Sequence, residues 1–304
     1  MDNKMKQDLG LQIWAWLKEF FGTGFWQGVG TSIFTFLVVL IYKNFRFFIL
    51  RFLRTIKFVI KKEKYVIFWN DHDITTSEKI ISLLKLQGLK HQFVALASPN
   101  ELLSYPLSPK MMHMVALIVS DVTKLSEVEE ERNLIQLKVV NYVRKGGVLF
   151  GFHDIIYKRC RNTALQTAFG CVICNFQRVA YPIHIEVVGE NRQHPLLKGI
   201  ESDFMSDDGE VCWGDWDKSA KILIRTVAEF QSTANTHLSA IQVPMLVVHH
   251  TGDLGTLIWS NCADKGDKLA NSLNEPQPHI IKILSNSLKY TDEIKQFYQQ
   301  PFNS

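Results

Sequence analysis

The sequence lacks a regular cysteine pattern. Its five cysteines do not make the framework of a small secreted disulfide protein, because they are odd in number and unevenly spaced. They are Cys160, Cys171, Cys174, Cys212 and Cys262. The pair Cys171 and Cys174 has redox or metal-binding spacing, but it has no second pair and lies in an apolar run. We predict buried structural thiols, and we predict no metal site.

Charged residues are missing from a long stretch near the N-terminus. The 23 residues between Glu19 and Lys43 carry no charge, which is enough for a helix that crosses a hydrocarbon core of about 30 Å. We predict one transmembrane helix over residues 24–42, with aromatic residues near both ends. A cleaved signal peptide would start earlier and end in a small-residue cleavage pattern. A buried soluble helix is the weaker alternative.

Acidic residues are almost absent from the segment that follows. Residues 43–64 hold eight basic residues and only Glu63, so this segment accounts for the basic net charge. We therefore do not predict nucleic-acid binding by the rest of the chain. The positive flank predicts a single-pass protein with its N-terminus outside and its C-terminal part in the cytoplasm. The segment can lie on anionic headgroups or continue the transmembrane helix as a stalk.

These features divide the chain into four predicted parts. Residues 1–23 form an amphipathic segment that lies on the membrane or packs between the protomers of a homo-oligomer. Residues 24–42 are the transmembrane helix, and residues 43–64 are a basic juxtamembrane helix. Residues 65–304 are a cytoplasmic domain.

The domain alternates strand and helix patterns in its first half. The apolar strand patterns and the helix patterns between them are typical of a doubly wound, mainly parallel sheet, as in a flavodoxin-like α/β fold. The strand patterns cover residues 64–70, 91–96, 114–121 and 148–154, and the helix patterns cover residues 75–89 and 127–147. After residue 171 the pattern predicts additional or antiparallel strands. These lie within residues 171–189, 220–230 and 243–261, the last as a hairpin, and one closing helix covers residues 278–298.

Polar side chains cluster where the predicted strands end. Ligands of a doubly wound sheet bind at the carboxyl ends of its strands, so we predict a pocket of imidazoles, amides and carboxylates there. The candidates are Asn70, Asp71, His72, Asp73, Ser120, Asp121, His153, Asp154, His194 and His249. The alternative roles are capping of the first helix for residues 71–73 and a fixed turn for His194. His249 and His250 should point to opposite faces of their strand.

Five stretches resemble one family when they are read in order. They are "GGVLFGFHD", "TALQTAFGCVICNF", "QHPLLKGI", "SDDGEVCWGDWD" and "VPMLVVHHTGDLGTLIWSN". Together they resemble the ThuA-like (trehalose utilisation) family of the class I glutamine amidotransferase-like superfamily, over about residues 65–262. The resemblance implies that superfamily's fold and carbohydrate-related ligands. It also carries the acidic residue of the family over to Glu210.

The chain lacks the nucleophile of true glutamine amidotransferases. Gly151, Phe152 and His153 stand where the resemblance would place the cysteine, so hydrolysis of glutamine by a thiolate is not predicted. Our first hypothesis is a membrane-anchored sensor or effector that binds a small polar sugar- or nucleotide-like molecule. The second is an enzyme on carbohydrate-like substrates, with His153 as acid or base, oriented by Asp71, Asp73 or Glu210. The third is a membrane-tethered scaffold. The sequence identifies no cofactor.

Overall fold

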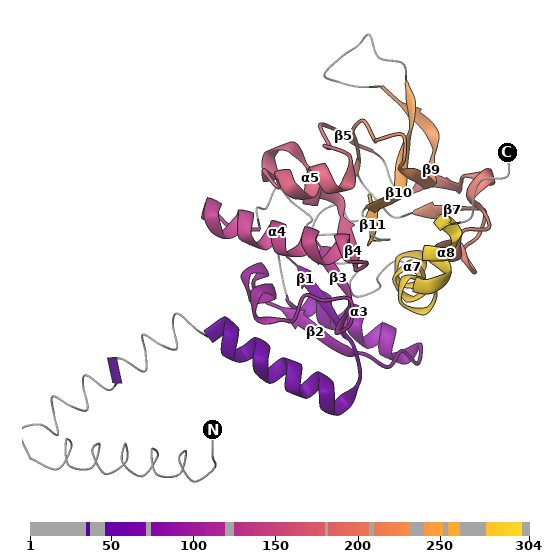
Figure 1. Ribbon diagram of the computed structural model, residues 1–304. Coiled ribbons are helices and arrows are strands. Elements are labelled where there is room, and N and C mark those ends of the chain that lie inside the picture. Colours follow the sequence, from indigo (N-terminus) through magenta and orange to yellow (C-terminus); the bar gives the residue numbers. More distant parts are fainter. Residues whose placement is uncertain are drawn as a thin grey trace, which may run out of the picture. The chain divides into compact units, whose positions relative to one another are not determined.

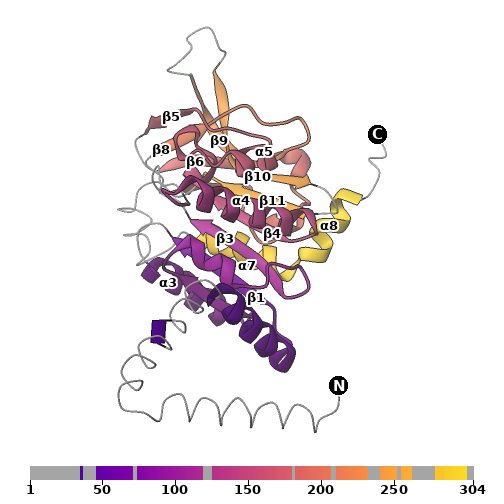
Figure 2. The ribbon, with the colours of Figure 1, turned by 60° about the vertical axis from the view of Figure 1, so that its left-hand side comes forward.

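The computed structural model (Figures 1 and 2) describes most of the C-terminal domain. The described residues are 35–36, 46–70, 74–118, 125–179, 182–206, 210–231, 240–251, 255–261 and 278–299. The predicted segment 1–23 lies outside them, and so does the predicted transmembrane helix over 24–42 apart from Thr35 and Phe36. Within the described ranges, no helix has the length and apolarity that crossing a membrane requires. The chain divides into two compact units, residues 1–52 and 53–304.

A nine-stranded sheet organises the second unit, with the order β2-β1-β3-β4-β11-β10-β9-β6-β7. The first five strands in this order are parallel. They are β2 (Gln92–Leu96), β1 (Tyr65–Asn70), β3 (Met112–Ile118), β4 (Val148–Phe152) and β11 (Gly255–Ser260). Every residue of β1 and β4 is buried. Helices cover both faces of the sheet, so side chains on both faces of these strands are buried, and their sequences are continuously apolar.

The other four strands are antiparallel. They are β10 (Ile241–Thr251), β9 (Lys221–Phe230), β6 (Ile183–Val187) and β7 (Asp203–Ser206). A separate two-stranded ribbon pairs β5 (Asn175–Arg178) with β8 (Glu210–Trp213). The predicted α/β class is confirmed. The sheet is mixed, because the β10–β11 hairpin reverses the chain and begins an antiparallel half.

Helices cover both faces of the sheet (Figures 1 and 2), and α4 contacts α5 while α3 contacts α7. The helices are α3 (Ile74–Leu86), α4 (Glu129–Arg144), α5 (Thr163–Phe169), α7 (Pro278–Lys289) and α8 (Thr291–Gln299). Short 3-10 turns lie in the connections between strands and helices, at η1 (Pro99–Ser104), η2 (His153–Ile156), η3 (Lys158–Cys160), η4 (Gly189–Asn191) and η5 (Pro195–Leu197). The sequence patterns over 75–89 and 127–147 correspond to α3 and α4. A further helix covers residues 46–61.

The single closing helix predicted over residues 278–298 is wrong. The chain forms two helices, α7 and α8, with a break at Tyr290. The side chain of Asn286 donates hydrogen bonds to the carbonyls of Leu196 and Lys198, which holds the end of α7 against η5. The hydroxyl of Thr291 lies 2.7 Å from Nε2 of His113 at the start of β3. These contacts fix the two helices to different parts of the sheet, so one straight helix does not form.

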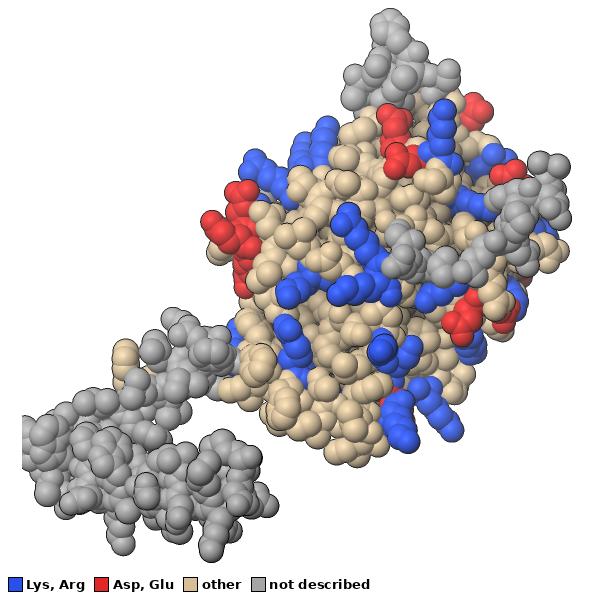
Figure 3. All heavy atoms as spheres, in the orientation of Figure 1, with Lys and Arg blue, Asp and Glu red and all other residues tan. Residues whose placement is uncertain are grey.

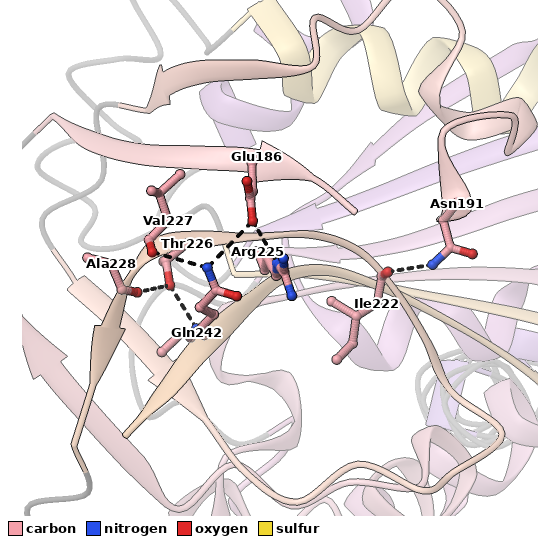
Figure 4. A network of polar contacts seen from close by, with 9 residues as sticks. Glu186, Asn191, Ile222, Arg225, Thr226, Val227, Ala228 and Gln242 are labelled. Atoms are coloured by element: carbon pink, nitrogen blue, oxygen red, sulfur yellow. Dashed lines mark hydrogen bonds and ion pairs between the residues drawn. The ribbon is translucent and has the colours of Figure 1, made fainter. Parts of the chain in front are cut away.

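Side chains bridge an irregularity in the antiparallel half of the sheet (Figure 4). The register between β9 and β10 shifts around Pro244, which has no backbone N–H for the ladder. The Thr226 hydroxyl accepts a hydrogen bond from the backbone N–H of Val243 and donates one to the carbonyl of Ala228, both 2.7 Å long. Beside it, Arg225 pairs with Glu186 at 2.8 Å. Polar side chains thus supply the bonds that a regular ladder would make.

Candidate functional site

The turn after β4 is tightly held at the carboxyl edge of the parallel strands. The carbonyl of Asp154 accepts hydrogen bonds from the backbone N–H of Tyr157 at 2.9 Å and from the Cys160 thiol at 3.1 Å. The side chain of Asn162 donates to the carbonyl of Ile155, and that of Gln166 donates to the carbonyl of Tyr157. Buried amides and a buried thiol therefore fix η2 and the residues after it.

The β5–β8 ribbon is attached to this turn. The backbone N–H of Lys158 donates to the carbonyl of Ile173, and the N–H of Ile173 donates to the carbonyl of Ile156, so the two segments run as a short parallel bridge. The chain then continues into β5, where Arg178 stands opposite Glu210 of β8. The guanidinium of Arg178 lies 3.8 Å from the Glu210 carboxylate. Within the ribbon, Trp213 stands nearest this bridge, opposite Asn175, and Glu210 stands at the far end, opposite Arg178.

A tyrosine and two carboxylates share this edge. Tyr157 is only 4% exposed. Burial raises the pKa of its phenol, and the carboxylates of Asp154 and Glu210 contribute to the rise, whereas the Arg159 guanidinium opposes it. The phenol therefore keeps its proton at neutral pH and can donate a hydrogen bond, and the two carboxylates that interact with it electrostatically can accept hydrogen bonds. Such a set can bind hydroxyl groups.

Asn261 is a residue of this edge that sequence reasoning missed. It follows β11 and is fully buried. Its side chain accepts a hydrogen bond from the backbone N–H of Cys212, and it donates to the carbonyls of Cys212 and Pro244 at 2.8 and 2.9 Å. Asn261 thus ties β8, which carries Glu210, to the main sheet. The only signal in the sequence is a polar residue placed directly after an apolar strand.

The predicted site residues fall into three groups. Asn70 ends β1 opposite Ile118 and is 5% exposed, so it lies at the carboxyl edge. Asp154 lies at this edge in η2, and Glu210 begins β8 of the two-stranded ribbon. The backbone of His153 begins η2 directly after β4, and its side chain is outside the described part of the chain. Outside the described residues altogether are Asp71, His72, Asp73, Ser120 and Asp121.

The third group lies away from the carboxyl edge, which corrects the prediction of one common pocket. His249 pairs with Leu257, three residues before the carboxyl end of β11, and its ring contacts the carbonyl of Ala168 at 3.0 Å and the Ser219 hydroxyl at 2.9 Å. Because β10 is antiparallel to β11, the chain after His249 reaches the opposite edge of the sheet, where the parallel strands begin. We call this the amino edge.

His194 lies at this amino edge. It follows β6, which also runs toward the amino edge, and its ring packs against Phe297 and Tyr298 of α8. His250 stacks on Tyr298 with 3.7 Å between ring centroids. His249 and His250 therefore contact different helices on opposite faces of the sheet, as the alternation along a strand predicts.

Burial makes two of the described cysteines, Cys160 and Cys171, unfavourable as nucleophiles. Within the described part of the chain, Cys160, Cys171, Cys174 and Cys212 form no disulfide. Cys160 is fully buried, and burial raises the pKa of the Cys171 thiol, which disfavours the reactive thiolate. Among the described residues, no group of three histidine, cysteine or acidic side chains is placed so that it could hold a metal ion.

We expect His194 to make the domain less stable in acid. Burial lowers the pKa of His194 to about 3, with His250 and Lys221 adding to the effect, against an ordinary value of 6.5. The unfolded chain therefore takes up a proton below pH 6.5 that the folded chain does not, and the free energy of unfolding falls by about 1.4 kcal/mol per pH unit. The change His194→Asn removes this titration and keeps an acceptor for the N–H of Leu196.

Urea unfolding at a series of pH values between 7 and 5 tests this expectation. In His194→Asn the slope of the unfolding free energy against pH should be smaller by about 1.4 kcal/mol per pH unit, which corresponds to the uptake of one proton. The same change at His184, which is exposed on β6, is the control and should leave the slope unaltered. Equal slopes for all three proteins would show that His194 does not stay neutral in the fold.

No protein-family model matches the sequence, and no curated protein matches it. Solved structures do match it in fold. A ThuA-like protein from Parabacteroides merdae superposes with a TM-score of 0.50 at 12% sequence identity, over 75% of this chain and 90% of that one. The chain shares the ThuA-like fold. The fold that the sequence motifs implied is therefore confirmed.

Two further structures match over similar shares of the chain. A ThuA-like protein from Bacteroides uniformis gives a TM-score of 0.49 at 15% identity, over 75% of this chain and 91% of that one. A glutamine amidotransferase from Thermotoga maritima gives 0.39 at 9% identity, over 78% and 95%. At such low identities the likeness concerns the fold, and the function has to be argued from the residues of this chain.

Proposed function

We propose that the domain binds a small, hydroxyl-rich molecule, sugar- or nucleotide-like, at the carboxyl edge of its sheet, beside η2 and the β5–β8 ribbon. The observation that carries the proposal is that the carboxylates of Asp154 and Glu210 both interact electrostatically with the phenol of Tyr157, which lies directly after η2. A phenol donates and a carboxylate accepts, so together they match the hydroxyl groups of a sugar or a ribose. This edge is also where open α/β sheets bind ligands.

The rigidity of the turn supports a binding role. A side chain at Gly151 would come within 2.8 Å of Ile155 and 2.9 Å of the Phe169 ring, so η2 folds closely over the end of β4. Together with the hydrogen bonds from Asn162 and Gln166, this packing holds Asp154 and Tyr157 in place without a ligand. Preorganised side chains lose little conformational entropy when a ligand binds.

We further propose that the N-terminal part anchors the domain to a membrane, with the domain in the cytoplasm, so that ligand binding acts as a signal there. The support is in the sequence, where 23 uncharged residues precede eight basic ones. This charge asymmetry is typical of a span whose following segment stays in the cytoplasm. The proposed role is that of a sensor or effector.

An enzyme acting on carbohydrate-like substrates is the second candidate. One observation favours it: η2 starts at His153, which places this residue directly after β4 and next to Asp154. An imidazole can serve as general acid or base. Formation of a product from the bound molecule, lost in His153→Ala while binding persists, would favour this candidate over a pure binding role.

We expect Glu210→Gln to weaken ligand binding by about tenfold or more, because a charge-assisted hydrogen bond is lost. Native mass spectrometry of the full-length protein, released from mild detergent, measures any retained small molecule and its loss in the variant. The matched control is Glu186→Gln, whose carboxylate pairs with Arg225 in the antiparallel half of the sheet.

Two outcomes would contradict the binding proposal. One is a ligand that both variants retain as well as the unsubstituted protein does. The other is an empty unsubstituted protein that also shows no mass or stability change with millimolar disaccharide or nucleoside diphosphate.

A further inference from the structure

The helix over residues 46–61 carries large apolar side chains on an exposed face. In the second unit these are Leu53, Ile56, Val59 and Ile60, exposed by 54%, 42%, 63% and 75%. At about 100° per residue the four side chains fall within an arc of about 120°. We call these four residues the apolar arc. An apolar stripe of this width normally faces a protein core, and here it is exposed.

The opposite side of this helix is fixed to the domain. Arg54 lies about 160° from the middle of the apolar arc. Its guanidinium stacks 3.5 Å above the Tyr105 ring and donates a hydrogen bond to the Ser104 hydroxyl. The Tyr65 hydroxyl donates to the Arg54 carbonyl at 3.0 Å. The helix cannot rotate to bury the apolar arc without breaking these contacts.

Basic side chains border the apolar arc. Lys57 and Lys61 are exposed and lie about 40° and 80° beyond its edge at Leu53. Lys62 is also exposed and ends the helix in the left-handed conformation, with φ of 57°. Glu63 is the one acidic residue within 43–64. Figure 3 shows a largely tan surface over this helix, with Lys and Arg side chains beside it.

The first unit, considered by itself, repeats this composition. Phe48, Ile49 and Phe52 are exposed by 67%, 40% and 60%, and Arg46 is exposed among them. Apolar side chains next to basic ones therefore run from residue 46 to residue 62 in the sequence.

We propose that the apolar arc binds the surface of an anionic lipid bilayer. Leu53, Ile56, Val59 and Ile60 would enter the boundary between headgroups and acyl chains, and Lys57, Lys61 and Lys62 would contact anionic headgroups. We favour a lipid surface as the partner because the basic residues Lys57 and Lys61, along the Leu53 side of the arc, and Lys62, at the helix end, match anionic headgroups. This contact is peripheral and adds to the proposed membrane attachment, but it does not require the span over 24–42.

The test uses the full chain and two vesicle types, phosphatidylcholine alone and phosphatidylcholine with phosphatidylserine. An environment-sensitive fluorophore is attached at Val59→Cys. The control is the same label at Leu86→Cys, which is 83% exposed at the end of α3. The unsubstituted chain, labelled in parallel, gives the background of its five cysteines. Co-flotation with the vesicles is measured on the same samples.

We expect the label at position 59 to shift to the blue with anionic vesicles, and the label at position 86 to stay in water. Lys57→Glu together with Lys61→Glu should weaken the response to anionic vesicles about tenfold or more, since each change replaces an attraction to anionic headgroups with a repulsion. A matched pair of charge reversals at Lys79 and Lys85 of α3 should leave the response unchanged.

The outcomes separate this inference from the proposed span. Flotation with both vesicle types while position 59 stays in water overturns the inference and leaves the span intact. Binding to anionic vesicles alone, with the blue shift, supports the inference without the span. Absence of flotation with either type contradicts both. A blue shift that appears without lipid and grows with protein concentration assigns the apolar arc to a second copy of the chain and overturns the inference.

Discussion

Replacing Asn261 with leucine is expected to destabilise the folded domain by about 4 kcal/mol, a large effect for one substitution. The leucine fits the volume of asparagine only roughly, and it cannot bond the N–H or carbonyl of Cys212 or the carbonyl of Pro244. All three backbone groups would then be buried without partners, at about 1–3 kcal/mol each before relaxation. Urea unfolding followed by circular dichroism measures the loss.

The matched control for this prediction is Asn191→Leu. Asn191 is also buried, but its side chain donates a single hydrogen bond, to the carbonyl of Ile222 at 2.9 Å (Figure 4). Its loss should cost about 1 kcal/mol. Equal effects at the two positions would mean that Asn261 does not hold β8 to the sheet. Because β8 carries Glu210, Asn261→Leu should also abolish ligand retention under conditions in which the protein is still folded.

Replacing Gly255 with alanine is expected to cost about 3 kcal/mol or more. Gly255 begins β11 where the strand passes the end of α4, and an added methyl group would collide with the backbone carbonyl of Val143. A backbone cannot move aside as a flexible side chain can, so either α4 or β11 must shift. Both elements belong to the core of the parallel half. The loss is measured as a drop in the unfolding midpoint.

Gly189→Ala is the control for this substitution. No atom lies within 4 Å of the position that its added methyl group would take. We therefore expect a change of about 1 kcal/mol or less, with a small gain allowed by the lower entropy of the unfolded chain. A Gly255→Ala protein as stable as Gly189→Ala would show that the contact between β11 and α4 is looser than the structure indicates.

The sequence determined the parts of the fold in which local pattern and burial agree. The apolar runs before Asn70 and before His153 predict β1 and β4, because buried parallel strands are apolar on both faces. The helix α4 follows from acidic residues in its first turn and Arg144 in its last, which suit the helix dipole. The alternation along a strand placed His249 and His250 on opposite faces. The order of motifs implied the ThuA-like fold.

Features that depend on contacts between distant segments of the chain could be learned only from the tertiary structure. The strands β7 and β8 have four residues each, too few to show a periodic pattern, and they form because β6 and β5 offer them partners. The break between α7 and α8 follows from bonds of Asn286 and Thr291 to η5 and β3. The sequence placed His194 and His249 with the other candidates because it does not show strand direction.

The candidate site could not be predicted from the sequence either, because it also depends on contacts between distant segments. Asp154, Glu210 and Asn261 are far apart in the chain, and no spacing rule connects them. Tertiary pairing connects them, because the β5–β8 ribbon that carries Glu210 is joined to the turn after β4, and Asn261 joins that ribbon to the end of β11. The sequence by itself determined the α/β class, the elements of the parallel half and the absence of the nucleophilic cysteine. The grouping of Tyr157 with two carboxylates was decided by tertiary pairing, since long-range hydrogen bonds leave no periodic trace in the sequence.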